Sequence, residues 1–161
     1  MNYIYIGKII TTHGLKGEVK LRSNFEYKDK VFKKDFMFYI GSKKEPHKVL
    51  SYRKHMDYDM VVLEGINDID QAIKYKQEKV YVLKEDIILD ENTYLDEDLI
   101  NLNVYYNNNF IGVITNIIDA GNNNMLMEIN NNKYIPRNNN FILKVDLEKH
   151  IIYLKDVEGL I

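Results

Sequence analysis

Short apolar runs separated by turn residues are the feature that most limits the folds open to this chain of 161 residues. β-Branched and aromatic residues are frequent in the runs, and residues 18–22 alternate apolar with charged side chains at the period of two. Runs of this kind that recur every roughly 8–12 residues predict a small antiparallel barrel or sandwich, not a βαβ fold. The strands predicted in the first half are residues 3–10, 18–22, 36–40, 47–52, 60–63 and 79–83.

Four asparagine triplets punctuate the second half of the chain. Asparagine tolerates positive φ and bonds its own backbone in turns, so each triplet predicts a bend between strands. A low-complexity, aggregation-prone tract is the alternative, but apolar strands of regular length separate the triplets. The triplets are residues 107–109, 122–124, 130–132 and 138–140. The strands predicted around them are residues 102–106, 110–118, 125–129, 133–135 and 151–154.

One short helix is predicted between the strands of the first half. Asn67 followed three residues later by Asp70 has the layout of a capping box, and Ile69, Ala72 and Ile73 fall on one helical face. The fold class predicted from these patterns is therefore all-β, with one or two short helices.

Charge divides the chain into two parts. Residues 1–84 hold 17 Lys and Arg against 11 Asp and Glu, a net charge of +6, whereas residues 85–161 hold 5 against 13, a net charge of −8. Opposite signs indicate two domains with different partners, because net charge governs association and not fold. An acidic stretch at about residues 85–93 is the predicted linker, so the expected domains are two small antiparallel β-barrels, residues 1–84 and 94–161.

Several classes of function are disfavoured by composition and motifs. The chain has no cysteine, which removes disulfides, thiolate metal sites and cysteine nucleophiles. No apolar run approaches the roughly 20 residues that span a bilayer, and the first residues lack the pattern of a signal peptide, so the protein is expected to be cytoplasmic, without a membrane partner. No nucleophile elbow, P-loop or Gly-x-Gly-x-x-Gly motif is present, so neither a cofactor nor a small-molecule substrate is expected.

Two acidic groupings are candidate catalytic or metal sites. His55, Asp57 and Asp59 would lie on one face of an extended strand, a weak metal signal. The alternative, which we favour, is that residues 56–59 connect the two strands of a hairpin. Asp96 and Asp98 could serve acid–base chemistry, but an acidic stretch beside a linker is more typical of a solvated face.

The segment from Thr12 to Gly17 is a more specific signal. Its two glycines permit a tight turn, and basic residues on both sides of that turn form a patch suited to phosphate contacts. The alternative is a solvated hairpin without a partner. Nearby aromatic surface, which core or edge packing explains equally well, comes from Tyr3, Tyr5, Tyr27 and Tyr39. The candidate rRNA-binding or ribosome-binding residues are Lys8, His13, Gly14, Lys16, Gly17, Lys20 and Arg22.

The run from residue 7 to residue 20, GKIITTHGLKGEVK, resembles the opening signature of the ribosome maturation factor RimM family. Residues 63–68, which lead into the Asp70-Gln71-Ala72 segment, resemble a second stretch of that family. Further matches follow in the family's order and cover nearly the whole chain, at residues 98–100, 111–114, 120–122, 134–136, 145–148 and 158–161.

The resemblance implies an N-terminal six-stranded barrel related to translation-factor barrels, followed by a PRC barrel. Members of the family are accessory factors without catalytic activity that bind the maturing small ribosomal subunit. They act at its head, where they associate with the small-subunit protein numbered nineteen, and they help its rRNA reach the processed form. The family often has an adjacent aromatic pair before an Asp-Leu-Ile-Gly segment; here Tyr94 keeps the first ring, Leu95 stands in place of the second, and Asn101 replaces the glycine.

We therefore predict a monomeric, non-enzymatic chaperone of small-subunit assembly. The basic first barrel is expected to contact small-subunit rRNA or a precursor subunit. The acidic second barrel, through Tyr94 and Asp98, is expected to bind a basic ribosomal protein of the head. Two alternatives remain open: a general RNA-binding barrel without a ribosomal target, and a metal-dependent hydrolase that uses His55, Asp57 and Asp59.

Overall fold

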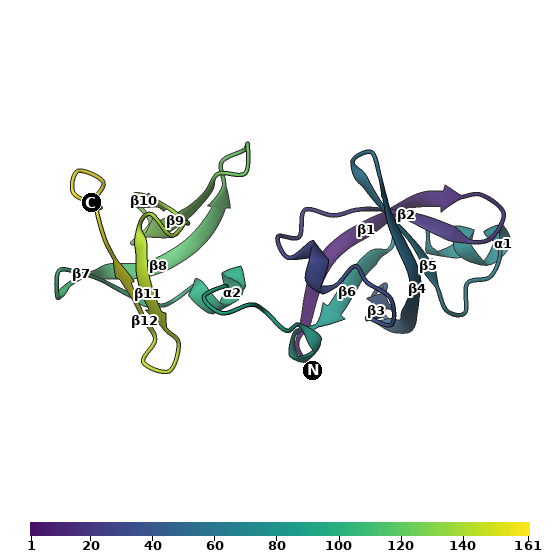
Figure 1. The fold of residues 1–161 in the computed structure, drawn as a ribbon, viewed down its shortest axis with the longest axis horizontal. Helices are drawn as coiled ribbons and strands as arrows, with labels where there is room; N and C mark the ends of the chain where they lie inside the picture. Colours follow the sequence, from purple (N-terminus) through teal and green to yellow (C-terminus); the bar gives the residue numbers. More distant parts are fainter. The chain divides into compact units, whose positions relative to one another are not determined.

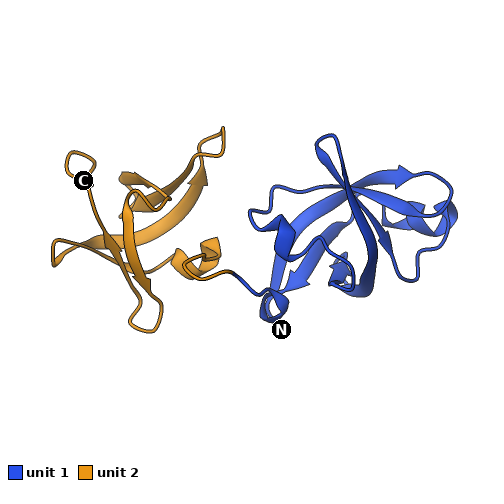
Figure 2. Cartoon of the chain, viewed as in Figure 1, with its two compact units in different colours: residues 1–89 blue, residues 90–161 orange.

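The computed structural model describes residues 1–161 and divides into two compact units, residues 1–89 and 90–161 (Figure 2). Each unit is built from strands, and the two α-helices, α1 (Ile69–Ala72) and α2 (Asp96–Leu99), have four residues each. The all-β prediction is confirmed. No helix is long and apolar enough to cross a membrane.

The first unit is a closed barrel of six strands in the order β1-β2-β5-β4-β3-β6 (Figure 1). Every neighbouring pair is antiparallel, and β6 closes the barrel by pairing with both β1 and β3. The side chains that alternate inward, among them Ile9, Leu21, Phe38 and Val80, form the core. The strands are β1 (Tyr3–His13), β2 (Glu18–Arg22), β3 (Met37–Ile40), β4 (Glu45–His55), β5 (Tyr58–Leu63) and β6 (Lys79–Leu83).

The helix predicted in the first half is present, but its cap differs from the prediction. Asp68, and not Asn67, is the N-cap: its carboxylate accepts a hydrogen bond of 2.9 Å from the backbone N–H of Gln71. The side chain of Gln71 in turn accepts from the N–H of Asn67 at 2.6 Å. The α-helix ends at Ala72, where a 3₁₀ turn (Ile73–Tyr75) begins. Ile73 is therefore 57% exposed instead of lying on the buried face with Ala72.

The second unit is a six-stranded sheet in the order β10-β9-β8-β7-β12-β11. The sheet is curled into an open half-barrel, because β10 and β11 end it without pairing with each other, and one neighbouring pair, β7 and β12, is parallel instead of antiparallel as predicted. β12 follows β11 through a short antiparallel hairpin and lies beside β7, from which four strands separate it along the chain. The strands are β7 (Asn103–Tyr106), β8 (Asn109–Asp119), β9 (Met125–Ile129), β10 (Lys133–Pro136), β11 (Ile142–Asp146) and β12 (Ile151–Leu154).

Turns at the asparagine triplets confirm the predicted bends. The first three triplets each contain two residues with positive φ, as expected of asparagine in tight turns. The fourth uses its side chain instead: Asn138 accepts a hydrogen bond from the N–H of Asn140 at 2.9 Å. This turn leads into β11, a strand that the sequence patterns did not predict.

The predicted linker, residues 85–93, overlaps a 3₁₀ turn (Lys84–Asp86) and the division between the units after Leu89. Ile87 packs against the core of the first barrel, whereas Ile88 is exposed.

Candidate nucleic-acid interface

Three of the predicted basic residues lie together on the outer face of the β1–β2 hairpin. Lys8 on β1 is paired in register with Arg22 on β2, and Lys20 lies two residues before Arg22 on the same strand. Val19 and Leu21, which alternate with them, are fully buried in the barrel. The period of two therefore directs Lys8, Lys20 and Arg22 away from the core.

Tyr58 on the neighbouring strand β5 orders two of these cations. The Lys20 ammonium lies 4.3 Å from the centroid of the Tyr58 ring, and the Arg22 guanidinium carbon lies 5.8 Å from it. Arg22 also donates a hydrogen bond of 3.4 Å to the Tyr58 hydroxyl. Both distances to the ring fall within the range of a cation–π contact. Sequence reasoning missed Tyr58 because it assigned the residue to a loop, whereas Tyr58 is the first residue of β5.

An ion pair borders this basic face. Arg53 on β4 donates two hydrogen bonds to the carboxylate of Glu18, at 2.8 and 3.1 Å. These bonds are the main reason that the pKa of Glu18 lies below its ordinary value, against the opposing effect of burial. His13 and His55, whose ring centroids are 6.1 Å apart, lie close enough to contribute to the same lowering. Because Glu18 neutralises Arg53, the positive charge on the outer face of the hairpin comes from Lys8, Lys20 and Arg22.

The two glycines of the turn have different roles. Gly17 has a φ of +83°, and a Cβ atom there would lie 2.9 Å from the carbonyl oxygen of Ile66 and 3.0 Å from the nitrogen of Asp68. Gly14 has a φ of +73° but faces open space. Gly17 thus holds the turn against the start of α1, while Gly14 only permits the bend. Lys16 is exposed in the turn between them and is not on the strands that carry Lys8, Lys20 and Arg22.

The structure does not bring His55, Asp57 and Asp59 together as a metal site. Met56 and Asp57 form a two-residue hairpin turn, and Asp59 already belongs to β5 with its carboxylate fully buried. That carboxylate accepts hydrogen bonds from the Lys28 ammonium at 2.7 Å and from the Tyr52 hydroxyl at 2.6 Å. The hairpin interpretation is confirmed, with a connection two residues shorter than predicted.

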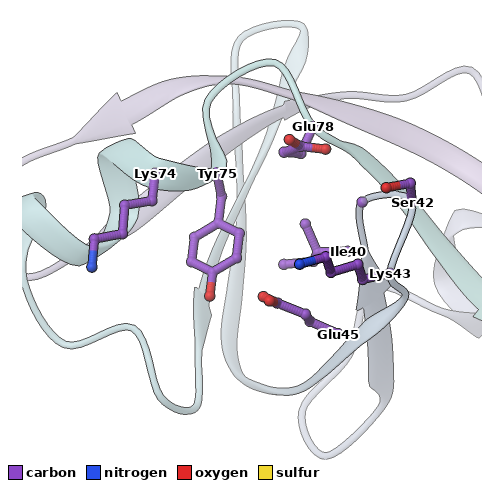
Figure 3. A pocket seen from close by; sticks show the side chains of 8 residues that line it. Ile40, Ser42, Lys43, Glu45, Lys74, Tyr75 and Glu78 are labelled. Carbon is purple, nitrogen blue, oxygen red and sulfur yellow. The ribbon is translucent and has the colours of Figure 1, made fainter.

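A surface pocket of about 270 Å³ lies elsewhere on the first barrel, between the β3–β4 turn and the 3₁₀ turn that follows α1. Figure 3 shows Tyr75 and Glu45 facing each other across it, with Lys43 alongside. Burial and a hydrogen bond to Glu45 raise the pKa of Tyr75. Two lysines and two glutamates line the pocket, so its charges offset one another and it favours no anion.

In the second unit, Tyr94 directly precedes the buried Leu95, and Asp98 follows it in helix α2. The ring of Tyr94 packs against the core of the sheet, and its carbonyl oxygen accepts a hydrogen bond from the Arg137 guanidinium. Asp98 is half-buried in α2. Arg137 also forms an ion pair of 3.4 Å with Asp96, so Arg137 fixes the chain on both sides of Leu95.

Comparison with known proteins finds one matching family model for each of the two units. The family model described as the RimM N-terminal domain matches residues 4–87, and the one described as the RimM PRC barrel domain matches residues 96–160. The chain belongs to the RimM family. The resemblance inferred from the sequence motifs is confirmed, and it holds for both domains in the expected order.

Curated RimM proteins match this chain over almost their full length. The ribosome maturation factor RimM of Staphylococcus haemolyticus is 35% identical, and the alignment covers 98% of each chain. The protein of the same name from Finegoldia magna is 30% identical, over 99% of this chain and 100% of its own. The solution structure of the N-terminal domain of RimM from Thermus thermophilus is 18% identical, with a TM-score of 0.48, and covers 55% of this chain and 98% of that one.

Leu95 is the residue of this RimM chain at which the sequence motifs lead us to expect the family's second aromatic residue. Leu95 is buried, and it is followed directly by α2. An aliphatic side chain therefore fills this site, and only Tyr94 keeps part of a ring at the surface.

Proposed function

We propose that this chain is a ribosome maturation factor, a non-enzymatic assembly chaperone that binds the immature small ribosomal subunit and promotes its maturation and rRNA processing. Full-length relatives named ribosome maturation factor RimM support this function. The observation that carries it within this structure is the outer face of Lys8, Lys20 and Arg22, ordered around the ring of Tyr58.

The basic face binds rRNA chiefly through phosphates. Cations that neutralise phosphates release counterions, which contributes affinity that does not depend on sequence and falls as salt rises. A chaperone of this kind works by binding one conformation of the precursor more tightly than others, which shifts the population toward that conformation. This role requires differential affinity and no bond-making step, so the proposal needs neither a catalytic residue nor a cofactor.

The second unit is proposed to bind a basic ribosomal protein of the subunit head, with the chain acting as a monomer. Residues 90–161 contain 5 Lys and Arg against 11 Asp and Glu, a net charge of −6. Charge of this sign attracts a basic partner and repels the rRNA around it. Tyr94 supplies the aromatic contact, and Asp98 supplies a carboxylate on the adjoining helix α2.

Co-sedimentation of the full chain with immature and mature small subunits tests the proposal. The parent protein should bind immature subunits preferentially. The double variant Lys20→Glu/Arg22→Glu should lose at least about tenfold in affinity, and the slope of log affinity against log salt should fall by about two. Lys34→Glu/Lys74→Glu is the matched control, since both lysines are exposed and lie outside the hairpin.

Two results would contradict the proposal. In one, the Lys20→Glu/Arg22→Glu variant sediments with immature subunits as the parent does. In the other, the parent binds unrelated structured RNAs as tightly as it binds the precursor, which would indicate a general RNA-binding barrel.

A further inference from the structure

Tyrosines form a second outer surface on the first barrel that the proposed function does not use. Tyr5 on β1 is paired with Tyr81 on β6, and Tyr81 is paired with Tyr39 on β3, so the three side chains form a row across adjacent strands. Tyr3 lies two residues before Tyr5 on the same face of β1. We call these four residues, Tyr3, Tyr5, Tyr39 and Tyr81, the tyrosine platform.

The rings of the tyrosine platform hold one another in place. Tyr3 lies 5.4 Å from Tyr39 and 6.5 Å from Tyr81, and Tyr5 lies 5.9 Å from Tyr81, between ring centroids. The interplanar angles of these contacts are 69° to 74°, an edge-to-face arrangement. Tyr5 is 50% exposed and the other three rings are half-buried. The platform is thus ordered before any partner binds, and its rings are not stacked on one another.

Two lysines lie over the platform. The Lys44 ammonium is 4.2 Å from the ring centroid of Tyr81 and 5.5 Å from that of Tyr3, and the Lys79 ammonium is 6.0 Å from that of Tyr5. Glu85 and Asp86 act on Tyr39, whose pKa is raised mainly by burial and further by these acids. The two lysines therefore contact the rings of Tyr3, Tyr5 and Tyr81, whereas the two acids influence Tyr39.

The platform is continuous with the basic face on the neighbouring strands. Lys8 on β1 is paired in register with Lys79 on β6 on one side and with Arg22 on β2 on the other. A row of three cations, Lys79, Lys8 and Arg22, therefore crosses adjacent strands beside the row of tyrosines. A ligand bound by its charge on the basic face would reach the tyrosine rings without leaving the barrel surface.

A flat ligand with exposed ring faces and a regularly spaced negative charge fits this combination. Unpaired nucleotides have both features, because every base offers a π-face and every linkage a phosphate. A duplex presents its phosphates but hides its base faces within the stack. An acidic peptide would satisfy the lysines but would leave the tyrosine rings without flat partners.

We propose that the tyrosine platform stacks unpaired bases of a single-stranded RNA segment whose phosphates contact Lys44, Lys79 and Lys8. The proposal rests on the proposed function, because it assigns to rRNA a second point of contact next to the basic face. Its consequence is specificity for an incompletely folded precursor, in which such bases are not yet paired.

Binding of labelled RNA to the full chain, measured by fluorescence anisotropy, tests the platform. The probes are an oligouridine of about 12 nucleotides, which is free of stable internal pairing, and a duplex of the same length. Tyr5→Leu and Tyr81→Leu should each lose about tenfold in affinity for oligouridine and keep the affinity of the parent for the duplex. Tyr5→Phe keeps the ring and should stay within about twofold of the parent.

Controls separate the platform from a general loss of structure or charge. Tyr134→Leu removes a ring that is 44% exposed on the second unit and should bind oligouridine as the parent does. Lys79→Ala should reduce the salt slope by about one, whereas the tyrosine variants should leave it unchanged. Thermal unfolding of each variant shows whether the barrel is intact, and Tyr5→Leu replaces the most exposed of the four rings.

The results distinguish failure of the platform from failure of the proposed function. If both leucine variants bind oligouridine like the parent while Lys20→Glu/Arg22→Glu still loses immature subunits, the platform is overturned and the proposed function stands. The platform would also be overturned if the leucine variants lost subunit binding but kept oligouridine binding, because the rings would then contact protein. Loss of oligouridine binding in the leucine variants, with subunit binding unaffected by Lys20→Glu/Arg22→Glu, would support the platform and contradict the proposed role of the basic face.

Discussion

At the scale of single residues, Asp59 shows how strand position decides what a carboxylate can do. From sequence, Asp59 was grouped with His55 and Asp57 as a possible metal ligand. The hairpin turn is two residues shorter than predicted, so Asp59 lies within β5 and its side chain is buried. There the Lys28 ammonium and the Tyr52 hydroxyl satisfy both carboxylate oxygens, which makes Asp59 a structural residue of the barrel.

Removing the hydroxyl that supports Asp59 should destabilise the barrel. Tyr52→Phe deletes the 2.6 Å hydrogen bond to a buried charge, which costs about 1.5–3 kcal/mol of the free energy of unfolding. Urea denaturation measures the loss. Tyr5→Phe is the control, since its ring is half-exposed, and it should change stability by less than about 0.5 kcal/mol. Equal stability of the two variants would show that Asp59 does not depend on Tyr52.

The Glu18–Arg53 pair should give Glu18 an acid-shifted titration. The pKa of Glu18 is expected below its ordinary value of 4.5, and Arg53→Gln should raise it toward that value because the two hydrogen bonds are lost. A carboxyl whose pKa is lowered on folding stabilises the protein above the unfolded pKa and loses that contribution as the pH falls through the folded pKa. The stabilisation is therefore present above about pH 4.5 and disappears at more acidic pH.

Carbon NMR of the glutamate carboxyl groups follows this titration residue by residue. An unaltered Glu18 midpoint in Arg53→Gln would rule out the pair as the cause of the shift.

At the scale of elements, the β1–β2 turn depends on Gly17 more than on Gly14. Gly17→Ala would combine a positive φ with close contacts of the new Cβ to the backbone of Ile66 and Asp68, and should cost about 2–3 kcal/mol. Gly14→Ala meets only the backbone strain and should cost about 1–2 kcal/mol. Denaturant unfolding of the two variants measures the difference, and a larger loss for Gly14→Ala would contradict this assignment.

Most of the strands could be predicted from sequence, because a half-buried strand imposes a period of two. The exceptions have physical causes. β11 has a partly exposed apolar pattern, with Leu143 in solvent, and therefore lacks clear alternation. The helix cap was placed one residue early because both Asn67 and Asp68 are good capping residues, and only the hydrogen bond to Gln71 distinguishes them.

At the scale of the whole molecule, the family and the sign of charge on each unit followed from sequence, whereas the functional surfaces did not. Tyr58 joins Lys20 and Arg22 only because β5 pairs with β2, and Tyr5, Tyr81 and Tyr39 form a row only because β6 lies between β1 and β3. Register between strands distant in sequence determines both surfaces. The sequence motifs therefore indicated the cations and three of the tyrosines, Tyr3, Tyr5 and Tyr39, but not Tyr58 or Tyr81.

The opposite charges of the two units predict that a charge reversal in one unit weakens binding to one partner and leaves binding to the other partner unchanged. Residues 1–89 hold 17 Lys and Arg against 13 Asp and Glu, and residues 90–161 hold 5 against 11. Lys20→Glu/Arg22→Glu should weaken binding to a small-subunit rRNA fragment by at least about tenfold and leave binding to a basic ribosomal protein of the head unchanged. Asp98→Lys should have the reverse effect, because like charges across an interface repel.

Filter binding for the RNA fragment and calorimetry for the ribosomal protein measure the two affinities separately. Lys144→Glu, which makes the acidic unit still more negative at an exposed position on β11, is the control for Asp98→Lys and should not weaken protein binding. If Asp98→Lys and Lys20→Glu/Arg22→Glu each weakened both affinities to the same extent, the two partners would share one surface. The opposite charges of the units would then reflect composition alone and would not assign each unit a different partner.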